Sequence, residues 1–228
     1  MSGFEPKTSE KSDLDKKWMK KRLDRAIKIQ PEYHLIVTEG TDTEPEYFGS
    51  IKDVINKKYP EKIKLDVYGE GDNTISLFQK AKTRAEESSN VYKHVWIVYD
   101  TDDFPADHIN KTAELCISES TEEVTYHAIW SNQCIELWFL LHFSFIQSDL
   151  HRSSYWPKLT GLLNFQGFGA YEKNRSDMYR ILLPYMDTAI ANAEKLAKTN
   201  DGKLPSESAP GTQVYLLVKK LRPYLQTN

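Results

Sequence analysis

The sequence predicts an α/β fold, a mostly parallel sheet flanked by helices, with a C-terminal helical extension packed on it. Short apolar, β-branched runs alternate with helix-like segments over residues 33–145, which is typical of a parallel sheet covered on both faces. After residue 148 the strand-like runs give way to helical patterns and polar loops. With 228 residues, the chain is long enough for one large domain with a real core.

Four strands are predicted from their apolar character. Residues 33–39 and 94–99 are rich in β-branched and apolar residues, as expected of strands that are buried on both faces, and the first run ends on the carboxylate of Glu39. Residues 63–67 alternate between apolar and polar side chains, and residues 124–130 form the last strand.

Helices are predicted between the strands and after them. The first has Pro45 and two acids in its first turn, where a fixed φ and the helix dipole favour them. The segment 134–143 is apolar nearly all round, so we expect it to be buried. The predicted helices are 43–59, 75–87, 106–118, 134–143, 155–165, 176–183, 186–199 and 212–225, with a loop at 202–211.

Three regions are expected along the chain. Residues 1–31 form a basic arm, with a helix from Leu14 to Ile29 whose lysines and arginines either contact phosphates or form a solvated face. Residues 32–147 form the α/β core. Residues 148–228 are a helical extension of the same domain, since no linker separates them from the core.

The composition is that of an ordinary globular protein, with 39% hydrophobic and 28% charged residues. The formal net charge of −3 gives no global basic field, so a nucleic-acid partner would have to be held by a local patch. The only cysteines, Cys116 and Cys134, argue against a disulfide framework and a four-cysteine zinc site. We see no signal peptide and no membrane-spanning run, and we therefore expect a cytoplasmic protein.

Carboxylates stand where predicted strands end. Glu39 follows the first strand, and Asp100 and Asp102 follow the strand at 94–99, at the sheet edge where ligands gather in α/β proteins. Each acid alone is explained as a strand end or a helix cap. Together they favour a cation site, because crowded carboxylates repel each other unless a cation lies among them. Oxygen ligands without histidine or cysteine favour Mg²⁺ or Mn²⁺, which can activate water and stabilise the leaving oxygen of a phosphodiester.

These stretches resemble the TOPRIM domain of topoisomerases, primases and related nucleases. More specifically, the chain resembles the RloB-like family of bacterial defence proteins over about residues 32–222. The matching stretches are Leu35-Ile-Val-Thr-Glu39-Gly-Thr-Asp-Thr-Glu44-Pro-Glu-Tyr-Phe48, Val98-Tyr-Asp-Thr-Asp102-Asp103, Ser131-Asn132-Gln-Cys-Ile-Glu136-Leu-Trp-Phe-Leu-Leu-His142-Phe143 and Tyr171-Glu-Lys173-Asn174.

The resemblance implies a TOPRIM-like fold and gives roles to individual acids. Glu39 matches the TOPRIM glutamate, a metal ligand or general acid/base. Asp100 and Asp102 match its two metal-binding aspartates, and Asp103 is the next acid beyond the motif. Glu44 resembles the second acid of the family's Glu-Gly-x-x-Thr-Glu pattern, or is simply an acid in the first turn of a helix.

Two further residues are catalytic candidates. Glu136, on a buried helix, has to be satisfied by a metal, a base or hydrogen bonds, and it could face the same cleft. Lys173 either neutralises charge on the transition state and contacts nucleic acid, or is an ordinary surface lysine. His142 lies on a different helix face from Glu136, and we expect a hydrogen-bonded core histidine.

A nucleic-acid contact region is predicted around Arg152 and Lys158. Both lie among aromatic residues that could stack on bases, although we expect at least half of the aromatics to be packed in the core. These aromatics are Tyr155, Trp156, Phe165, Phe168 and Tyr171.

The function expected from the resemblance is a metal-dependent nuclease, a hydrolase acting on DNA, RNA or tRNA in antiviral defence by abortive infection. One alternative is a non-catalytic binding or regulatory module of a defence complex, with a partner such as an ATPase. Another is nucleotidyl or phosphoryl transfer, because one fold supports several chemistries.

Overall fold

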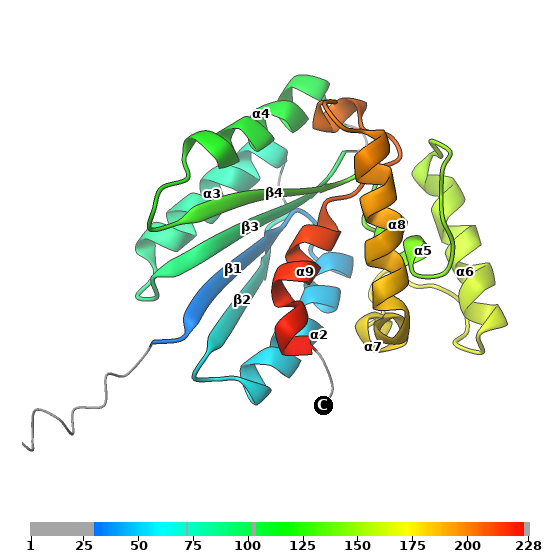
Figure 1. The fold of residues 1–228 in the computed structure, drawn as a ribbon, viewed down its shortest axis with the longest axis horizontal. Coiled ribbons are helices and arrows are strands. Elements are labelled where there is room, and N and C mark those ends of the chain that lie inside the picture. The colour runs from blue at the N-terminus through cyan, green and yellow to red at the C-terminus, as the bar shows by residue number, and fades with distance from the viewer. Residues whose placement is uncertain (1–29, 72, 102–103, 226–228) are drawn as a thin grey trace, which may run out of the picture. The chain divides into compact units, whose positions relative to one another are not determined.

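A four-stranded parallel sheet organises the structure, a computed structural model that describes residues 30–71, 73–101 and 104–225. Its strands are β1 (Glu32–Thr38), β2 (Ile63–Gly69), β3 (Tyr92–Asp100) and β4 (Thr125–Ser131), in the spatial order β2-β1-β3-β4 (Figure 1). The predicted α/β class is therefore confirmed. The basic helix predicted from Leu14 to Ile29 lies outside the described residues.

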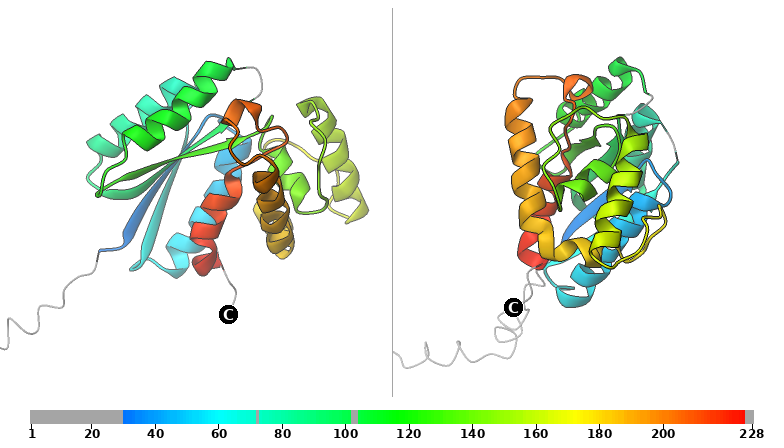
Figure 2. Two further views of the ribbon diagram at one scale, coloured as in Figure 1. Left: turned by 45° about the horizontal axis from the view of Figure 1, so that its top comes forward. Right: turned by 90° about the vertical axis from the view of Figure 1, so that its right-hand side faces the viewer.

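Alternate residues of the central strands face two separate cores. Leu35 and Val37 of β1 pack with α3 (Thr74–Glu87) and α4 (Ala106–Ser118) on one face. Ile36 faces the other way and joins the core that contains α2 (Thr43–Lys58) and the C-terminal helices. Figure 2 shows α3 and α4 together on one side of the sheet and α2 with α9 on the other. Both faces of β1 and β3 are thus covered, which explains the apolar runs at residues 35–37 and 95–98.

The two central strands feed helices on opposite faces of the sheet. β1 leads into α2 on one face, and its neighbour β3 leads into α4 on the other. Where neighbouring parallel strands send their connections to opposite faces, a crevice opens beyond their carboxyl ends. This crevice follows directly from the strand order.

The C-terminal helices extend the core beneath α2. They are α5 (Glu136–Leu141), α6 (Tyr155–Phe165), α7 (Met178–Leu182), α8 (Met186–Thr199) and α9 (Val214–Leu225). The chain returns to the sheet just before α9, where Ser131 forms an antiparallel bridge with Thr212. The backbone N–H of Gln213 also donates to the carbonyl of Trp130, at 2.8 Å. The predicted helical extension is therefore packed on the sheet.

Helix ends differ from the prediction where the local sequence interrupts the pattern. The helix predicted at 134–143 is shortened to Glu136–Leu141. The one predicted at 176–183 becomes α7 followed by a 3₁₀ turn at Leu183–Tyr185, which contains Pro184. Proline cannot donate the backbone hydrogen bond that would continue the helix. The loop at 202–211 holds a short 3₁₀ helix, Pro205–Glu207. Among the described residues, no helix is both long and apolar enough to cross a membrane.

Truncation of Leu217 tests whether α9 belongs to the core. Leu217 is fully buried, and Leu217→Ala is expected to lower the free energy of unfolding by about 2–5 kcal/mol, through lost contacts and the cavity left behind. Urea unfolding of the purified protein measures the change. The adjacent Leu216 is 43% exposed, so Leu216→Ala is a matched control with a much smaller effect. Equal losses in the two variants would contradict the packing of α9 described here.

Candidate active site

Glu39 and Asp100 meet at the carboxyl ends of the central strands. The Glu39 amide donates to the carbonyl of Val98 at 2.9 Å, which extends the pairing of β1 and β3 by one residue. The Asp100 amide then donates to Oε2 of Glu39 at 3.1 Å. The helix that follows has Asp42 as its N-cap residue, so Glu39 does not cap it. A helix cap, one of the two structural explanations considered for Glu39, is thereby excluded.

A cavity of about 270 Å³ opens at this point. Its walls come from the loop after β1, the end of β3, the start of α5 and the C-terminal extension. Asp42, which the sequence did not single out, lines the cavity from an exposed position. The predicted site residues that the cavity brings together are Glu39, Glu44, Asp100, Glu136, Arg152 and Lys173.

Glu44 belongs to this group rather than to a solvated helix turn. It is only 5% exposed although it lies in the first turn of α2. Gly40 makes this position possible, because a Cβ atom built on Gly40 would lie 2.2 Å from Oε2 of Glu44. The glycine of the Glu39-Gly40 pair thus allows the carboxylate of Glu44 to approach the backbone closely.

The crowded acids are hard to ionise without a cation. Burial raises the pKa of Glu39 to about 7, against the hydrogen bond from the Asp100 amide, and nearby Glu44 adds to the rise. Burial and the charge of Glu136 raise the pKa of Glu44 to about 7, against the opposing charge of Lys173. Burial, followed by Glu44, Glu39 and Glu136, raises the pKa of Asp100 well above its usual range. Clusters of this kind are common at functional sites.

Glu136 is 3% exposed and is held by two aromatic side chains. Its Oε1 accepts hydrogen bonds from the Tyr171 hydroxyl at 2.8 Å and from the Trp156 indole N–H at 3.1 Å. The sequence suggested these two aromatics only as surfaces for stacking on bases. Their polar contacts were missed because residues 136, 156 and 171 are distant in the chain. Both contacts depend on how α5 packs against α6 and the loop that follows it.

The predicted basic residues are divided between two places. Arg152 and Lys173 line the acidic cavity, and the Lys173 ammonium lies 4.7 Å from the centre of the Trp156 ring. Lys158 instead lines a separate hollow of about 360 Å³, beside Leu140 and Leu162. Asp102 and Asp103 lie outside the described residues, so their predicted metal-binding role stays a prediction.

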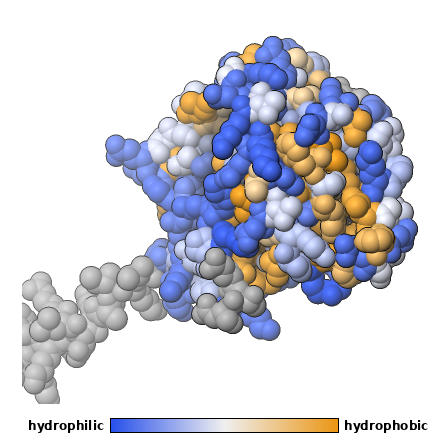
Figure 3. All heavy atoms as spheres, turned by 45° about the vertical axis from the view of Figure 1, so that its right-hand side comes forward, coloured by the Kyte–Doolittle hydropathy of each residue, from blue (hydrophilic) through white to orange (hydrophobic). Residues whose placement is uncertain are grey.

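The remaining aromatics differ in exposure. Tyr155 is fully buried, and its hydroxyl donates to the carbonyl of Asn132, whereas Phe165 at the end of α6 is 88% exposed. The side that carries the C-terminal helices shows a stretch of hydrophobic surface among hydrophilic residues (Figure 3). His142 is a core histidine, as expected, with Nδ1 at 2.9 Å from the carbonyl of Trp138.

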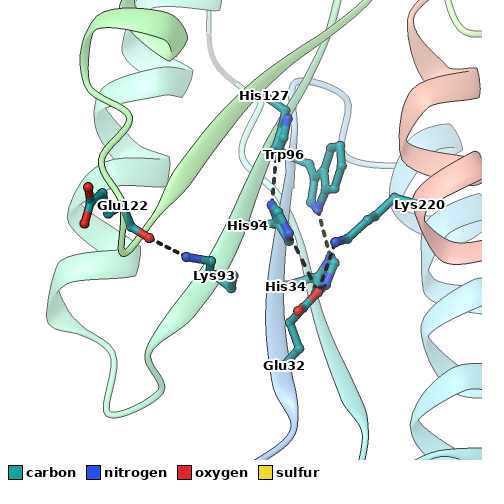
Figure 4. A network of polar contacts seen from close by, with 8 residues as sticks. All are labelled: Glu32, His34, Lys93, His94, Trp96, Glu122, His127 and Lys220. Atoms are coloured by element: carbon teal, nitrogen blue, oxygen red, sulfur yellow. Dashed lines mark hydrogen bonds and ion pairs between the residues drawn. The ribbon is translucent and has the colours of Figure 1, made fainter.

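A second group of ligand-type side chains lies near the amino end of the sheet (Figure 4). One atom each of Glu32, His34 and His94 fall within 4.8 Å of one another, as they would around a metal ion. The histidines lie on neighbouring strands, with His34 paired to His94 in register. No sequence pattern indicated this group, because the register that aligns the histidines is set only when the strands pair.

Hydrogen bonds already use the ligand atoms of this second group. The Trp96 indole can only donate, and its N–H lies 3.1 Å from Nδ1 of His34. Neutral His34 therefore carries its proton on Nε2 and donates it to Glu32 at 2.8 Å. In this state Nε2 has no lone pair for a metal. Lys220 of α9 also lies 3.3 Å from the same oxygen of Glu32, so we assign the group as a hydrogen-bond network.

The fold and the acidic cavity together define a class: an α/β protein with a carboxylate-lined crevice at the carboxyl edge of a parallel sheet. The family described as RloB-like protein matches residues 34–221, well over half of the chain. The chain therefore belongs to the RloB-like family, as its sequence motifs suggested. No curated protein and no solved structure matches it.

The histidine network predicts a specific dependence of stability on pH. The network includes His127, whose Nε2 lies 3.0 Å from Nδ1 of His94. Burial lowers the pKa values of His34, His94 and His127 from 6.5 to about 4. Between these pH values the unfolded chain binds protons that the folded chain does not, so acid weakens the network's contribution to folding. The raised pKa values of Glu39 and Glu44 act in the opposite direction, so the wild-type curve alone is not diagnostic.

The test is the difference in unfolding free energy between the wild type and His34→Gln. This difference is expected to be largest above pH 6.5 and to shrink as the pH falls toward 4, because the substitution removes one of the depressed histidines. Urea unfolding at several pH values measures it. His151→Gln, which replaces an exposed histidine outside the network, is the control. A difference that stays constant over this range would refute the network's role.

Proposed function

We propose that the chain is a divalent-metal-dependent nuclease of TOPRIM type that hydrolyses phosphodiesters in antiviral defence. The observation that carries the proposal is the meeting of Glu39, Asp100, Glu44 and Glu136 around one cavity, at the switch point of the sheet. In α/β folds of this kind the switch point is the usual ligand site. The class of substrate is nucleic acid, DNA, RNA or tRNA, and the expected compartment is the cytoplasm.

Charge balance in the cavity favours a divalent cation. Five carboxylates line the cavity, the exposed Asp42 among them, with two basic side chains, Arg152 and Lys173, so the fully ionised lining has an excess of three negative charges. One Mg²⁺ or Mn²⁺ ion would compensate two of these charges and would allow acids with raised pKa values to ionise together. A surface module without a bound cation would have no need for acids so close together.

The donor set fits a hard cation. Cys134 lines the same cavity, but burial, then Glu136 and Asp100, raise the pKa of its thiol, so it remains protonated. A protonated thiol is a poor metal ligand, which leaves carboxylate oxygens as the available donors. Glu39, Asp100, Glu44 and Glu136 are therefore the residues that would hold the ion, with Asp102 as a further candidate from its motif.

The acidic and basic side chains of the cavity would have different roles in the reaction. A bound divalent cation lowers the pKa of water and polarises a phosphodiester. The backbone amide of Asp100, at the end of β3, fixes the Glu39 carboxylate through the hydrogen bond between them. Arg152 and Lys173, from the C-terminal extension, line the same cavity, where they can bind the phosphate and the charge that develops on it. A defence partner such as an ATPase would control access to this site.

Asp100→Asn is expected to raise the stability of the metal-free protein and to abolish its stabilisation by Mn²⁺. Removal of one crowded charge should raise the unfolding free energy in EDTA by roughly 0.5–2 kcal/mol, the usual size of such a gain. The same change should abolish the stabilisation that Mn²⁺ gives the wild type, about 2.7 kcal/mol at 100 times the Kd. Thermal unfolding with Mn²⁺ and with EDTA measures both effects.

The activity assay uses labelled DNA, RNA and tRNA with Mg²⁺, Mn²⁺ or EDTA. Metal-dependent cleavage by the wild type that is lost in Asp100→Asn supports the nuclease. Asp107→Asn, which changes an exposed aspartate on α4, should cleave normally. Intact substrates under every condition, with no stabilisation by metal, would favour a binding module, and nucleotide-dependent growth of products would favour a transferase.

Gly40→Ala is expected to weaken Mn²⁺ binding without unfolding the protein. The new methyl group would overlap the carboxylate of Glu44, a side-chain end that can move out of the cavity. We expect a loss of at least about tenfold in Mn²⁺ affinity, which is 1.4 kcal/mol. Isothermal titration with Mn²⁺ measures it. Gly49 lies on the same helix as Glu44, and no atom lies within 4 Å of a Cβ built on it. Gly49→Ala should therefore bind Mn²⁺ normally. Unchanged affinity in Gly40→Ala would remove Glu44 from the site.

A further inference from the structure

The carboxylate of Glu136 is unusual in having only neutral partners. It is 3% exposed, and no ion pair joins it to a lysine or arginine of the described residues. Burying a carboxylate is costly unless hydrogen bonds compensate for the lost water. The Trp156 indole and the Tyr171 hydroxyl supply those bonds, and neither of them cancels the negative charge.

Both donors bind the same oxygen atom. Tyr171 lies 2.8 Å and Trp156 3.1 Å from Oε1 of Glu136. An oxygen of a carboxylate has two lone-pair directions, so these two bonds occupy Oε1. Neither donor uses the other oxygen, Oε2, in a residue that lines the cavity with Asp100 and Glu44 and also interacts with the neutral Cys134 thiol.

The two donors are themselves held in place. Tyr171 donates its backbone N–H to the hydroxyl of Thr160 at 3.2 Å, and its ring packs edge-on against Phe139. Trp156 is 37% exposed, and Lys173 lies over its ring. Burial, and then the charge of Glu136, raise the pKa of Tyr171, so its hydroxyl remains a donor throughout the neutral range.

We infer that Trp156 and Tyr171 are positioning residues that present Glu136 to the cation through a single oxygen, Oε2. The inference rests on the proposed function, because it assigns this pair a role at the proposed metal site. Hydrogen bonds from outer residues orient metal ligands, and their loss typically weakens metal binding. The pair keeps the full charge of Glu136 available, which a lysine or arginine in the same place would not. Through these two donors, the C-terminal extension sets the geometry of an acid on the core.

The test compares Mn²⁺ affinities of the full chain, from the electron paramagnetic resonance signal of free Mn²⁺. Tyr171→Phe removes only the hydroxyl, and Trp156→Phe removes the N–H from a partly exposed site that should tolerate the change. Each is expected to weaken Mn²⁺ binding by about 10- to 100-fold. Tyr155→Phe removes a neighbouring hydroxyl that donates to Asn132 instead, and it should bind Mn²⁺ normally.

A double-mutant comparison distinguishes positioning from a structural role. If Tyr171 acts through Glu136, Tyr171→Phe should cause no further loss of Mn²⁺ affinity once Glu136→Gln is present. Full additivity of the two losses would overturn the inference. So would Tyr171→Phe and Trp156→Phe variants that lose stability in EDTA but keep wild-type Mn²⁺ affinity. A wild-type chain that binds no Mn²⁺ at all would instead overturn the proposed function itself, and the inference with it.

Discussion

The hydrogen bond from the Asp100 amide to the Glu39 carboxylate, 3.1 Å long, is the contact on which the candidate site depends. It forms one residue past the last pairing of β1 with β3, where the two chains diverge toward α2 and α4 on opposite faces. The divergence opens a crevice, and the bond holds the Glu39 carboxylate at the end of β3, next to Asp100. Gly40 then lets a third acid, Glu44, turn back toward the same point. The strand order and one glycine thus bring three carboxylates together in spite of their mutual repulsion.

The crevice is built from both parts of the chain. The core supplies the acids, and the C-terminal extension supplies Arg152, Lys173 and the two neutral donors to Glu136. The extension is therefore more than a cover for apolar surface. Its basic groups line the same cavity as the acids, while its aromatic groups hold one acid without neutralising it.

The sequence predicted most of the fold because its signals were local. Apolar runs and their alternation with helices gave the parallel sheet, and Glu39 and Asp100 were found because both follow such runs. Glu44 could be a helix acid or a site acid, and only the packing against Gly40 distinguishes the two. Lys158 and Lys173 looked alike in sequence, yet only Lys173 faces the acids. The contacts of Trp156 and Tyr171, and the histidine network, depend on tertiary packing and strand register, which no local pattern encodes.

The bridge between Ser131 and Thr212 bears on when this part of the structure can fold during translation. The segment at 211–213 pairs with the end of β4 and with Asn132, just before the residues that place Glu136. During translation the end of β4 and Asn132 lack these partners until residues 211–213 have been made and have left the ribosome. The turn that leads from β4 to Glu136 is therefore fully supported only after this segment has emerged. Nascent chains that end before it would carry the acids without this support.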